Sequence, residues 1–403
     1  MLDCRKKNLA LLWWVFFSCG AARAGAQVQL GIDVLEREDF APLQGRHIGL
    51  VTNQTGVDSQ GEKTRLILAR APGVRLVALF TPEHGLDGTE LAGRYVSSRR
   101  DRLTGLMAWS LYGPTRKPTP RMLEGIDTLV YDMQDIGCRS YTYVSTLAMC
   151  MEAAGEAGIE VIVLDRPNPL GGLRIEGPGR EDRWKSFIGE FPVPYVHGMT
   201  VGELARMADA EGWVQPRCRL GIIQMRGWNR QMSWEDTGLR WVKPSPNIPY
   251  DTSPMYYVAT GMIGELAGME TGVGSEEPFE IAAAHYASAD RVMVELEELR
   301  PSGVSFAPYY GGHFEGVRLR IEPHADTNLT ALGIYLLAGL DAGRRPDLFQ
   351  DSDEDKLEMF FKAYGSGGIR DQIERGMSPS RIVASWAGFD SRFEAERAPY
   401  LLY

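Results

Sequence analysis

Short apolar runs alternate with stretches of helical spacing over the first half of the chain. Helical spacing falls between the runs, at 64–70 and 144–156. Strands that alternate with helices form crossover units, so the pattern predicts a Rossmann-like, mostly parallel α/β sheet with helices on its faces. The predicted strands are Arg46–Thr52, Val74–Phe80, Thr128–Asp132 and Glu160–Asp165.

The pattern changes in the second half. Thr200 with Glu203 forms a capping-box sequence that starts a helix at Val201, and 220–225 reads as a strand. The segment 241–249 (WVKPSPNIP) holds three prolines, which exclude a helix or a central strand. We therefore predict a catalytic domain at 28–254 and a smaller α+β domain at 255–403. In the latter we expect a strand at 316–321 and helices at 328–342, 353–363, 369–375 and 378–386.

The first 26 residues have a different character. A basic run at Arg5–Lys7 precedes the apolar stretch Leu9–Phe17, and small residues follow. This order predicts a signal peptide over residues 1–26, cleaved after Ala24 or Ala26, and hence export to the periplasm or the medium. A buried N-terminal helix and a lipoprotein acylated at Cys19 are the alternatives, and Phe16-Phe17-Ser18 is a poor lead-in for the second. No later stretch is apolar enough to span a membrane, so we expect no span in the mature chain.

Composition narrows the classes of function. The 403 residues are 44% hydrophobic and 24% charged, with a formal net charge of −10, which argues against a nucleic-acid partner. Three cysteines follow the predicted cleavage site, and an odd number cannot pair completely. We interpret Cys138, Cys150 and Cys218 as buried apolar residues, with a Cys138–Cys150 disulfide as the alternative.

The motifs of common cofactors and nucleophiles are missing from the sequence. There is no GxxxxGK[ST] loop, no GxGxxG after the first strand, no GxSxG and no HExxH. We therefore expect no nucleotide, no metal and no Ser-based acyl transfer. Carboxylates are left as the candidate chemical groups.

Polar residues follow each predicted strand directly. In open α/β sheets ligands bind outside the carboxyl ends of the strands, so these side chains should share one edge. Turns also favour polar residues, so a purely structural role is the alternative. The residues concerned are Asn53, Glu83, His84, Asp132, Asp135, Asp165, Arg166 and Asn168.

Glu83 is the first candidate catalyst. It follows an apolar strand, and a buried carboxyl favours the protonated form that glycoside hydrolysis needs as an acid. Capping of the next segment or pairing with His84 is the alternative. Asp132 and Asp135 flank Gln134 and are suited to activate water, to stabilise an oxocarbenium charge or to polarise a 2-acetamido group. Binding a cation or accepting hydrogen bonds from turn amides is the alternative, and the last is the common fate of Asp after a strand.

Further polar and aromatic residues accompany these carboxyls. An arginine such as Arg139 can bind a carboxylate in two parallel bonds, and Tyr141 and Tyr143 can stack on sugars. A structural Arg–Asp bridge beside core tyrosines is the alternative. Asp165 and Arg166 are expected to contact a ligand or each other, and His197 precedes a helix N-terminus, where a structural role is common.

These segments together resemble the family of exo-β-N-acetylmuramidases of the NamZ type. The resemblance extends from Gly31 to Tyr403. The matching runs are Phe80–Gly88, Ser110–Gly113, Leu123–Leu147, Val163–Gly172, Arg174–Gly179, Pro194–Ala205, Trp241–Pro249 and Tyr400–Tyr403.

The resemblance implies a nucleotide-free Rossmann-like domain, a smaller second domain and an active-site cleft between them. It also implies release of terminal N-acetylmuramic acid from peptidoglycan fragments, with Glu83 as general acid. Arg139 or Arg166 would recognise the lactyl carboxylate, and the second catalytic group is left open among Asp132, Asp135, Glu265 and the substrate acetamide. Residues that match the family's sugar-site motifs are Asp132, Gln134, Asp135, Arg139 and Tyr141, and the matching proline run adds Ser245 and Asn247.

The chain departs from the family at one position. Many relatives carry Gly-Arg-Gly-Thr where this sequence has Gly272-Val273-Gly274-Ser275, so the aglycone or the muramic acid modification is left open. A non-catalytic envelope protein that binds the same sugar is the alternative function. An esterase or amidase would need a nucleophile–base pair, which the sequence does not offer. The oligomeric state is also left open.

Overall fold

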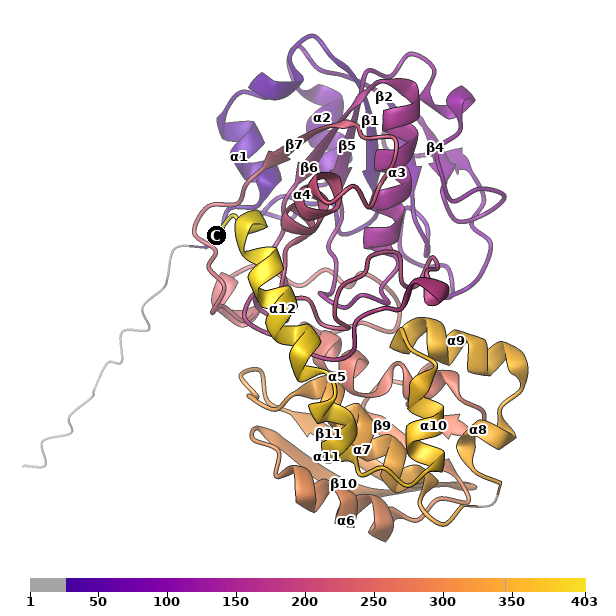
Figure 1. The fold of residues 1–403 in the computed structure, drawn as a ribbon. Coiled ribbons are helices and arrows are strands. Elements are labelled where there is room, and N and C mark those ends of the chain that lie inside the picture. The colour runs from indigo at the N-terminus through magenta and orange to yellow at the C-terminus, as the bar shows by residue number, and fades with distance from the viewer. Residues whose placement is uncertain (1–26, 345) are drawn as a thin grey trace, which may run out of the picture.

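The computed structural model describes residues 27–344 and 346–403 (Figure 1). The predicted signal peptide and Cys19 lie outside these residues. Two layered units are visible, a larger one with a central sheet and a smaller one around a second sheet.

A seven-stranded sheet forms the centre of the first unit. Its order is β3-β4-β2-β1-β5-β6-β7, and the pairs are parallel except for the β3–β4 edge. The predicted mostly parallel α/β sheet is therefore confirmed. The strands are β1 (His47–Thr52), β2 (Arg75–Thr81), β3 (Arg99–Arg100), β4 (Met107–Ser110), β5 (Thr128–Asp132), β6 (Glu160–Leu164) and β7 (Arg219–Ile223).

Helices cover both faces of this sheet, which is why its central strands read as continuous apolar runs. Ile48 and Leu50 of β1 pack with residues of α1 (Gly31–Arg37) and α2 (Thr64–Arg70). Val51 belongs to the opposite face, with α3 (Tyr143–Ala157) and α4 (Val201–Ala210). The predicted capping box of α4 is confirmed, because Thr200 Oγ1 accepts from Glu203 N and the Glu203 carboxylate accepts from Thr200 N.

The second unit holds an antiparallel sheet of order β10-β11-β9-β8. Its strands are β8 (Met269–Glu270), β9 (Ile281–His285), β10 (Val304–Gly311) and β11 (Phe314–Ile321). The helices are α5 (Ser253–Thr260), α6 (Ala289–Leu299), α7 (Leu329–Asp341), α8 (Leu348–Asp351), α9 (Glu354–Tyr364), α10 (Gly368–Glu374), α11 (Pro379–Ala384) and α12 (Ala387–Arg397). Short 3-10 turns lie at Ala41–Leu43, Pro120–Leu123, Asp182–Trp184, Glu235–Thr237, Ile263–Glu265 and Ala398–Tyr400.

Two strands of this unit were not predicted from the sequence. Strand β9 is mostly alanine, a poor strand former, and it is held by pairing with β11 on one side and β8 on the other. Strand β10 contains Pro308, which is tolerated because β10 lies at the sheet edge. Both strands therefore form because of pairing with distant segments and not because of their own sequence preference.

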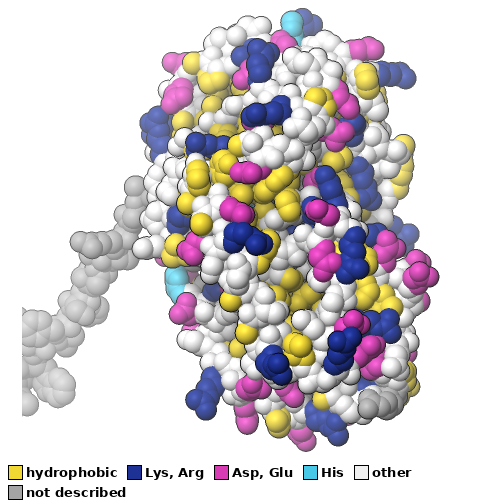
Figure 2. Space-filling view, viewed as in Figure 1, with side chains coloured by type: hydrophobic (Ala, Val, Ile, Leu, Met, Phe, Trp, Pro, Cys, Tyr) yellow, Lys and Arg dark blue, Asp and Glu magenta, His cyan; other side chains and the backbone are white. Residues whose placement is uncertain are grey.

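The described surface is mixed in charge. On the face in Figure 2, Lys and Arg side chains are interspersed with Asp and Glu over both units. Cys138 and Cys150 are buried and unpaired, and Cys218 is half-buried, so the alternative Cys138–Cys150 disulfide is not formed. Within residues 27–344 and 346–403, no helix is long and apolar enough to cross a bilayer.

Candidate active site

The parallel strands β1, β2, β5 and β6 end at one edge of the large sheet, and this edge faces the second unit (Figure 1). The loops that leave these ends carry most of the predicted polar residues. The structure separates them into a group with unsatisfied polar atoms and a group committed to internal bonds.

Glu83 follows β2 and is buried, with 8% of its surface exposed. Its Oε1 accepts from Gly93 N at 2.8 Å, and its Oε2 accepts from Thr142 Oγ1 at 2.9 Å. His84 takes a left-handed backbone (φ 67°), and its Nδ1 lies 2.8 Å from Glu90 O. Glu83 is therefore held by the 90–93 loop and by the start of α3, and not by His84.

Asp135 is the second buried carboxyl. Its Oδ2 accepts from Gly137 N at 2.7 Å, while its Oδ1 has no partner among the described residues. Burial raises the pKa of Asp135 to about 7, against the opposing effect of the turn amides of Gly137 and Ile136. This carboxyl can therefore gain or lose a proton near neutral pH.

Phenol and amide groups lie beside these two carboxyls. The Tyr143 hydroxyl donates to Pro244 O at 2.5 Å, and its electrostatic neighbours include Glu83 and Asp135. The Tyr141 and Tyr143 rings meet edge to face at 4.8 Å. Tyr141 OH makes no well-formed hydrogen bond, and burial raises the pKa of both tyrosines, so both are neutral.

Two amide side chains are also incompletely satisfied. Asn53 Oδ1 accepts from Thr55 N at 2.9 Å, but Asn53 Nδ2 has no well-formed bond. Gln134 Nε2 donates to Asp135 O and Pro167 O, both at 2.8 Å, and Gln134 Oε1 is unpartnered among the described residues. Buried polar atoms are normally hydrogen-bonded, so these orphans are places where a ligand would bind.

The contacts of Asp132 and Arg166 argue against the predicted ligand roles. Asp132 is fully buried and accepts from Arg166 Nε at 2.6 Å, from Arg166 Nη2 at 2.9 Å and from Thr64 Oγ1 at 2.5 Å. Arg166 Nη2 also donates to Val57 O. The closed pair presents neither a free carboxylate nor a free guanidinium fork, so the structure gives these two roles no support and both stay predictions.

Arg139, the other arginine predicted to bind the lactyl carboxylate, is engaged in internal bonds. Its side chain is buried, and its Nη1 donates to Pro178 O and Val193 O, while its Nη2 donates to Ala363 O and Tyr364 O. Burial lowers its pKa to about 10, so it keeps its charge. The two Nη atoms tie the strand-end loop to the end of α9, while Nε has no partner among the described residues, and the predicted substrate role stays a prediction.

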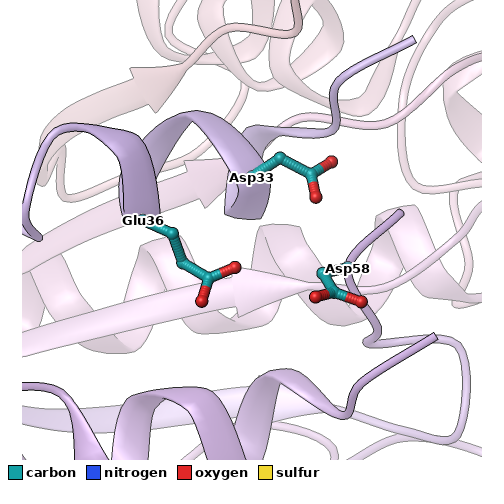
Figure 3. A group of neighbouring side chains, drawn as sticks. All are labelled: Asp33, Glu36 and Asp58. Carbon is teal, nitrogen blue, oxygen red and sulfur yellow. The ribbon is translucent and has the colours of Figure 1, made fainter. Parts of the chain in front are cut away.

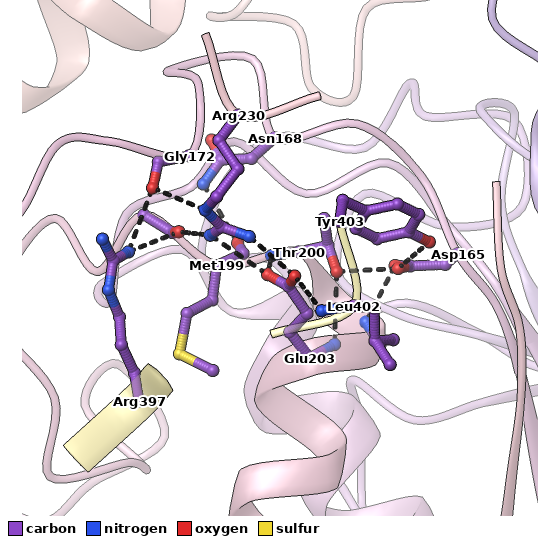
Figure 4. Close-up of polar contacts among 12 residues, drawn as sticks. Asp165, Asn168, Gly172, Met199, Thr200, Glu203, Arg230, Arg397, Leu402 and Tyr403 are labelled. Carbon is purple, nitrogen blue, oxygen red and sulfur yellow. Dashed lines mark hydrogen bonds and ion pairs between the residues drawn. The ribbon is translucent and has the colours of Figure 1, made fainter. Parts of the chain in front are cut away.

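Asp165 and Asn168 make internal bonds to neighbouring loops (Figure 4), and His197 lies two residues before Met199. Asp165 accepts from Thr200 Oγ1, Gly202 N and Tyr403 OH, and Asn168 Nδ2 donates to Met199 O. His197 is buried, and burial followed by neighbouring arginines lowers its pKa to about 3, so it is neutral. Asp165 and Asn168 are engaged in internal bonds, whereas His197 Nε2 has no partner among the described residues, and all three substrate-binding roles stay predictions.

The same network anchors the end of the chain to the first unit. Helix α12 returns from the second unit, and Arg397 Nη1 donates to Gly172 O, His197 O and Gly198 O. Leu402 N donates to Glu203 Oε1. Residues 397–403 therefore help to fix how the two units meet.

Four residues near Glu83 were missed as individual candidates. Thr142 and Tyr112 flank Glu83, and burial followed by the Glu83 charge raises the pKa of Tyr112 to about 12. Tyr257 of α5 packs edge to face on Tyr141 at 6.0 Å, and its hydroxyl lies 3.0 Å from Ser140 Oγ. Thr142, Tyr112 and Ser140 lie inside the matching runs, so the signal was present, but Tyr257 comes from the second unit.

The remaining predicted residues lie around this group. Glu265 is half-buried in the turn Ile263–Glu265, and burial raises its pKa. Its charge and that of Glu83 both act on Tyr257. Ser245 is buried and Asn247 half-buried on the proline-rich loop, next to the Pro244 carbonyl that Tyr143 contacts.

One carboxylate cluster lies elsewhere, at Asp33, Glu36 and Asp58, whose oxygens are within 4.8 Å of one another (Figure 3). Asp33 accepts from Leu30 N and from Ser59, and Asp58 Oδ1 accepts from Gln60 N. The Asp33 and Asp58 carboxylates thus accept hydrogen bonds from nearby turns, a common structural role, so we assign no metal to the cluster.

The candidate site therefore combines two buried carboxyls with neutral phenols and amides at the junction of two units. Such a set supports proton transfer and sugar binding, the chemistry of a glycoside hydrolase. Family models agree with this class. Residues 48–252 match the N-terminal domain, and residues 255–403 the C-terminal domain, of the exo-beta-N-acetylmuramidase NamZ.

Individual relatives give the same result. The chain is 39% identical over 387 residues to the peptidoglycan beta-N-acetylmuramidase NamZ of Bacillus subtilis (strain 168), covering 94% of this chain and 92% of that one. Two DUF1343 family proteins from Bacteroides fragilis NCTC 9343 have similar crystal structures. They show 40% identity with a TM-score of 0.86 and 25% identity with a TM-score of 0.72, each covering 94% of this chain and 99% of theirs. The chain belongs to the NamZ family of exo-β-N-acetylmuramidases, as its motifs predicted.

Proposed function

We propose that this protein is an exo-acting glycosidase that releases terminal β-linked N-acetylmuramic acid from peptidoglycan fragments. Membership of the NamZ family and the name of the Bacillus subtilis relative support this activity. The main structural support is the position of Glu83, a buried carboxyl at the end of a strand. It lies in the same group as polar atoms of Asp135, Asn53 and Tyr141 that lack hydrogen-bond partners among the described residues.

Glu83 is the residue that we propose transfers the proton to the glycosidic oxygen. The Thr142 hydroxyl and the Gly93 amide fix its two oxygens, so the carboxyl has a defined orientation without a substrate. A positioned acid of this kind contributes a factor of roughly 10²–10⁴ to the rate. Loss of the carboxyl should therefore lower turnover by about this factor while the protein stays folded.

For the second catalytic group we propose Asp135, Glu265 or the substrate's own acetamide. Asp135 is the stronger candidate on the protein side, because its Oδ1 is free and its pKa lies near neutrality. In one protonation state it can polarise or orient the 2-acetamido group, and in the other it can stabilise developing positive charge at the sugar. Arg139 and Arg166 are not part of this proposal, because their Nη atoms are engaged in internal bonds.

An assay of the purified protein with two chromogenic substrates tests this function. One carries β-linked N-acetylmuramic acid and the other β-linked N-acetylglucosamine. Release from the muramic substrate alone is the expected result. Binding of the muramic substrate with release from neither would favour the alternative, a non-catalytic envelope protein that binds the same sugar.

We also propose that the protein is exported. The support is the order of basic, apolar and small residues in the first 26 positions, which is typical of a signal peptide. N-terminal sequencing of the protein recovered from the medium or the periplasm should begin after Ala24 or Ala26. Recovery of the uncleaved chain from the cytoplasm would contradict export, and a lipid on Cys19 would show the lipoprotein alternative.

A further inference from the structure

The leaving group of the proposed reaction begins at Glu83. A general acid protonates the oxygen that joins the two sugars, so the leaving sugar starts within about 3 Å of the Glu83 carboxyl. The Oε2 atom of this carboxyl faces Thr142, which is buried, whereas its Oε1 atom accepts from the N–H of Gly93, which is exposed. The leaving sugar is therefore expected to extend along the loop 90–95, which carries Gly93.

This loop exposes two large apolar side chains. Leu91 is 64% exposed and Tyr95 is 61% exposed. The Tyr95 ring rests against Gly113, because a side chain at position 113 would place its Cβ atom only 3.1 Å from Cε2 of that ring. The glycine thus lets the ring lie close to the backbone while most of its surface stays open to solvent. Neighbouring exposed apolar side chains of this kind are typical of ligand-binding surfaces.

Tyr112, the residue before Gly113, connects this surface to the catalytic carboxyl. It lies beside Glu83, whose charge acts on its hydroxyl. The Cζ atom of Arg116 lies 4.7 Å from the centre of the Tyr112 ring and 4.2 Å from the centre of the Phe187 ring. Within residues 27–344 and 346–403, Arg116 forms no ion pair or hydrogen bond. Two aromatic rings therefore position a guanidinium group whose N–H donors have no acceptor from this part of the protein.

We propose that Tyr95, Tyr112 and Arg116 form the subsite for the leaving sugar, with Tyr95 as a stacking platform and Arg116 as a hydrogen-bond donor. The inference rests on the proposed function, because it takes Glu83 as the group that protonates the glycosidic oxygen. A sugar such as N-acetylglucosamine presents C–H groups that pack on an aromatic ring, and hydroxyl and acetamido oxygens that accept from a guanidinium. The muramic acid then lies on the buried side of Glu83, toward Asp135, and the leaving sugar on the exposed side.

Titration calorimetry in a Glu83→Gln background, which should bind the substrate without cleaving it at a measurable rate, tests the proposal. The variants are Tyr95→Ala, Tyr95→Phe and Arg116→Met. Tyr310→Ala is the matched control, because Tyr310 is 67% exposed on β10, far from the first unit (Figure 1). One probe is the disaccharide in which N-acetylmuramic acid is β-linked to N-acetylglucosamine, and the other is N-acetylmuramic acid alone.

Tyr95→Ala should weaken binding of the disaccharide roughly tenfold, and Arg116→Met roughly threefold or more. Tyr95→Phe keeps the ring, so it should bind the disaccharide as its parent does, and so should Tyr310→Ala. Affinity for N-acetylmuramic acid should not change in any variant, because this sugar does not reach the subsite. Unchanged affinity of Tyr95→Ala for the disaccharide would overturn the proposal, as would equal losses for the two probes or a parent that binds both probes equally.

Turnover without the Glu83→Gln change shows which of the two proposals fails. The substrates are the disaccharide and β-N-acetylmuramyl fluoride, whose leaving group is a single atom. Tyr95→Ala should lower kcat/KM about tenfold for the disaccharide and leave it unchanged for the fluoride. If the wild type cleaves the disaccharide and Tyr95→Ala has the same kcat/KM, the activity stands and the subsite is wrong. If Tyr95→Ala loses affinity for the disaccharide but the wild type cleaves neither substrate, the sugar-binding surface stands and the glycosidase activity is wrong.

Discussion

The buried Arg139 offers a direct test of how the two units are held together. Its guanidinium donates to carbonyls of Pro178 and Val193 and to carbonyls of Ala363 and Tyr364. Arg139→Met keeps much of the side-chain volume but removes all four bonds and leaves the carbonyls without these donors.

The size of the effect follows from these contacts. A hydrogen bond to a charged group contributes about 1.5–3 kcal/mol, and such values do not add fully. The desolvation cost of the buried arginine offsets part of the gain. We therefore expect Arg139→Met to lower the free energy of unfolding by about 3–5 kcal/mol, a large loss for a single substitution.

Urea denaturation followed by tryptophan fluorescence measures this loss, with Arg121→Met as a control at an exposed arginine. Where Arg139→Met is still folded, its KM for the muramic substrate should equal that of the wild type. A loss of less than 1 kcal/mol together with a KM raised about tenfold would refute the reasoning, because that result is expected if Arg139 reads a substrate carboxylate.

Three further predictions concern Asp135, Tyr403 and Val273. Burial raises the pKa of Asp135 from 3.8 to about 7, so the folded state holds a proton that the unfolded state releases, and stability should fall as pH rises from about 4 to 7. Asp135→Asn should remove this slope, which corresponds to roughly 3–4 kcal/mol, in thermal melts across that range. Tyr403→Phe removes a bond to Asp165 Oδ2 and should cost about 1–3 kcal/mol in urea denaturation, and wild-type stability would show that the chain end is not an anchor. Val273 is half-exposed in a turn, so Val273→Arg should change the melting temperature little, and any change in KM would assign the position to the aglycone.

The sequence predicted the sheet of the first unit well because its signals are local. A strand buried on both faces appears as an apolar run, and the Thr200–Glu203 capping box is visible in four residues. The second unit was harder to predict, since three of the five residues of β9 are alanine and the strand is held by β11, which follows about 30 residues later.

For the candidate site, the sequence predicted where the polar residues lie but not how they pair. The pattern located polar residues at the strand ends, and the structure places them at one edge. The sequence pattern could not show which of these side chains contact each other. Asp132 and Arg166 form a closed pair, whereas Asp135, three residues from Asp132, has an oxygen without a partner among the described residues. Pairing between side chains on separate loops is a tertiary property, and so is the approach of Tyr257 from the second unit.

The most direct test of the account is the rate of release from the β-linked muramic substrate by Glu83→Gln. Glu90→Gln is the control, an exposed carboxylate on the same loop. Glu83→Gln should lose a factor of roughly 10²–10⁴ in kcat while it binds N-acetylmuramic acid as the wild type does, and Glu90→Gln should be fully active. Full activity of Glu83→Gln would contradict the central role of this carboxyl.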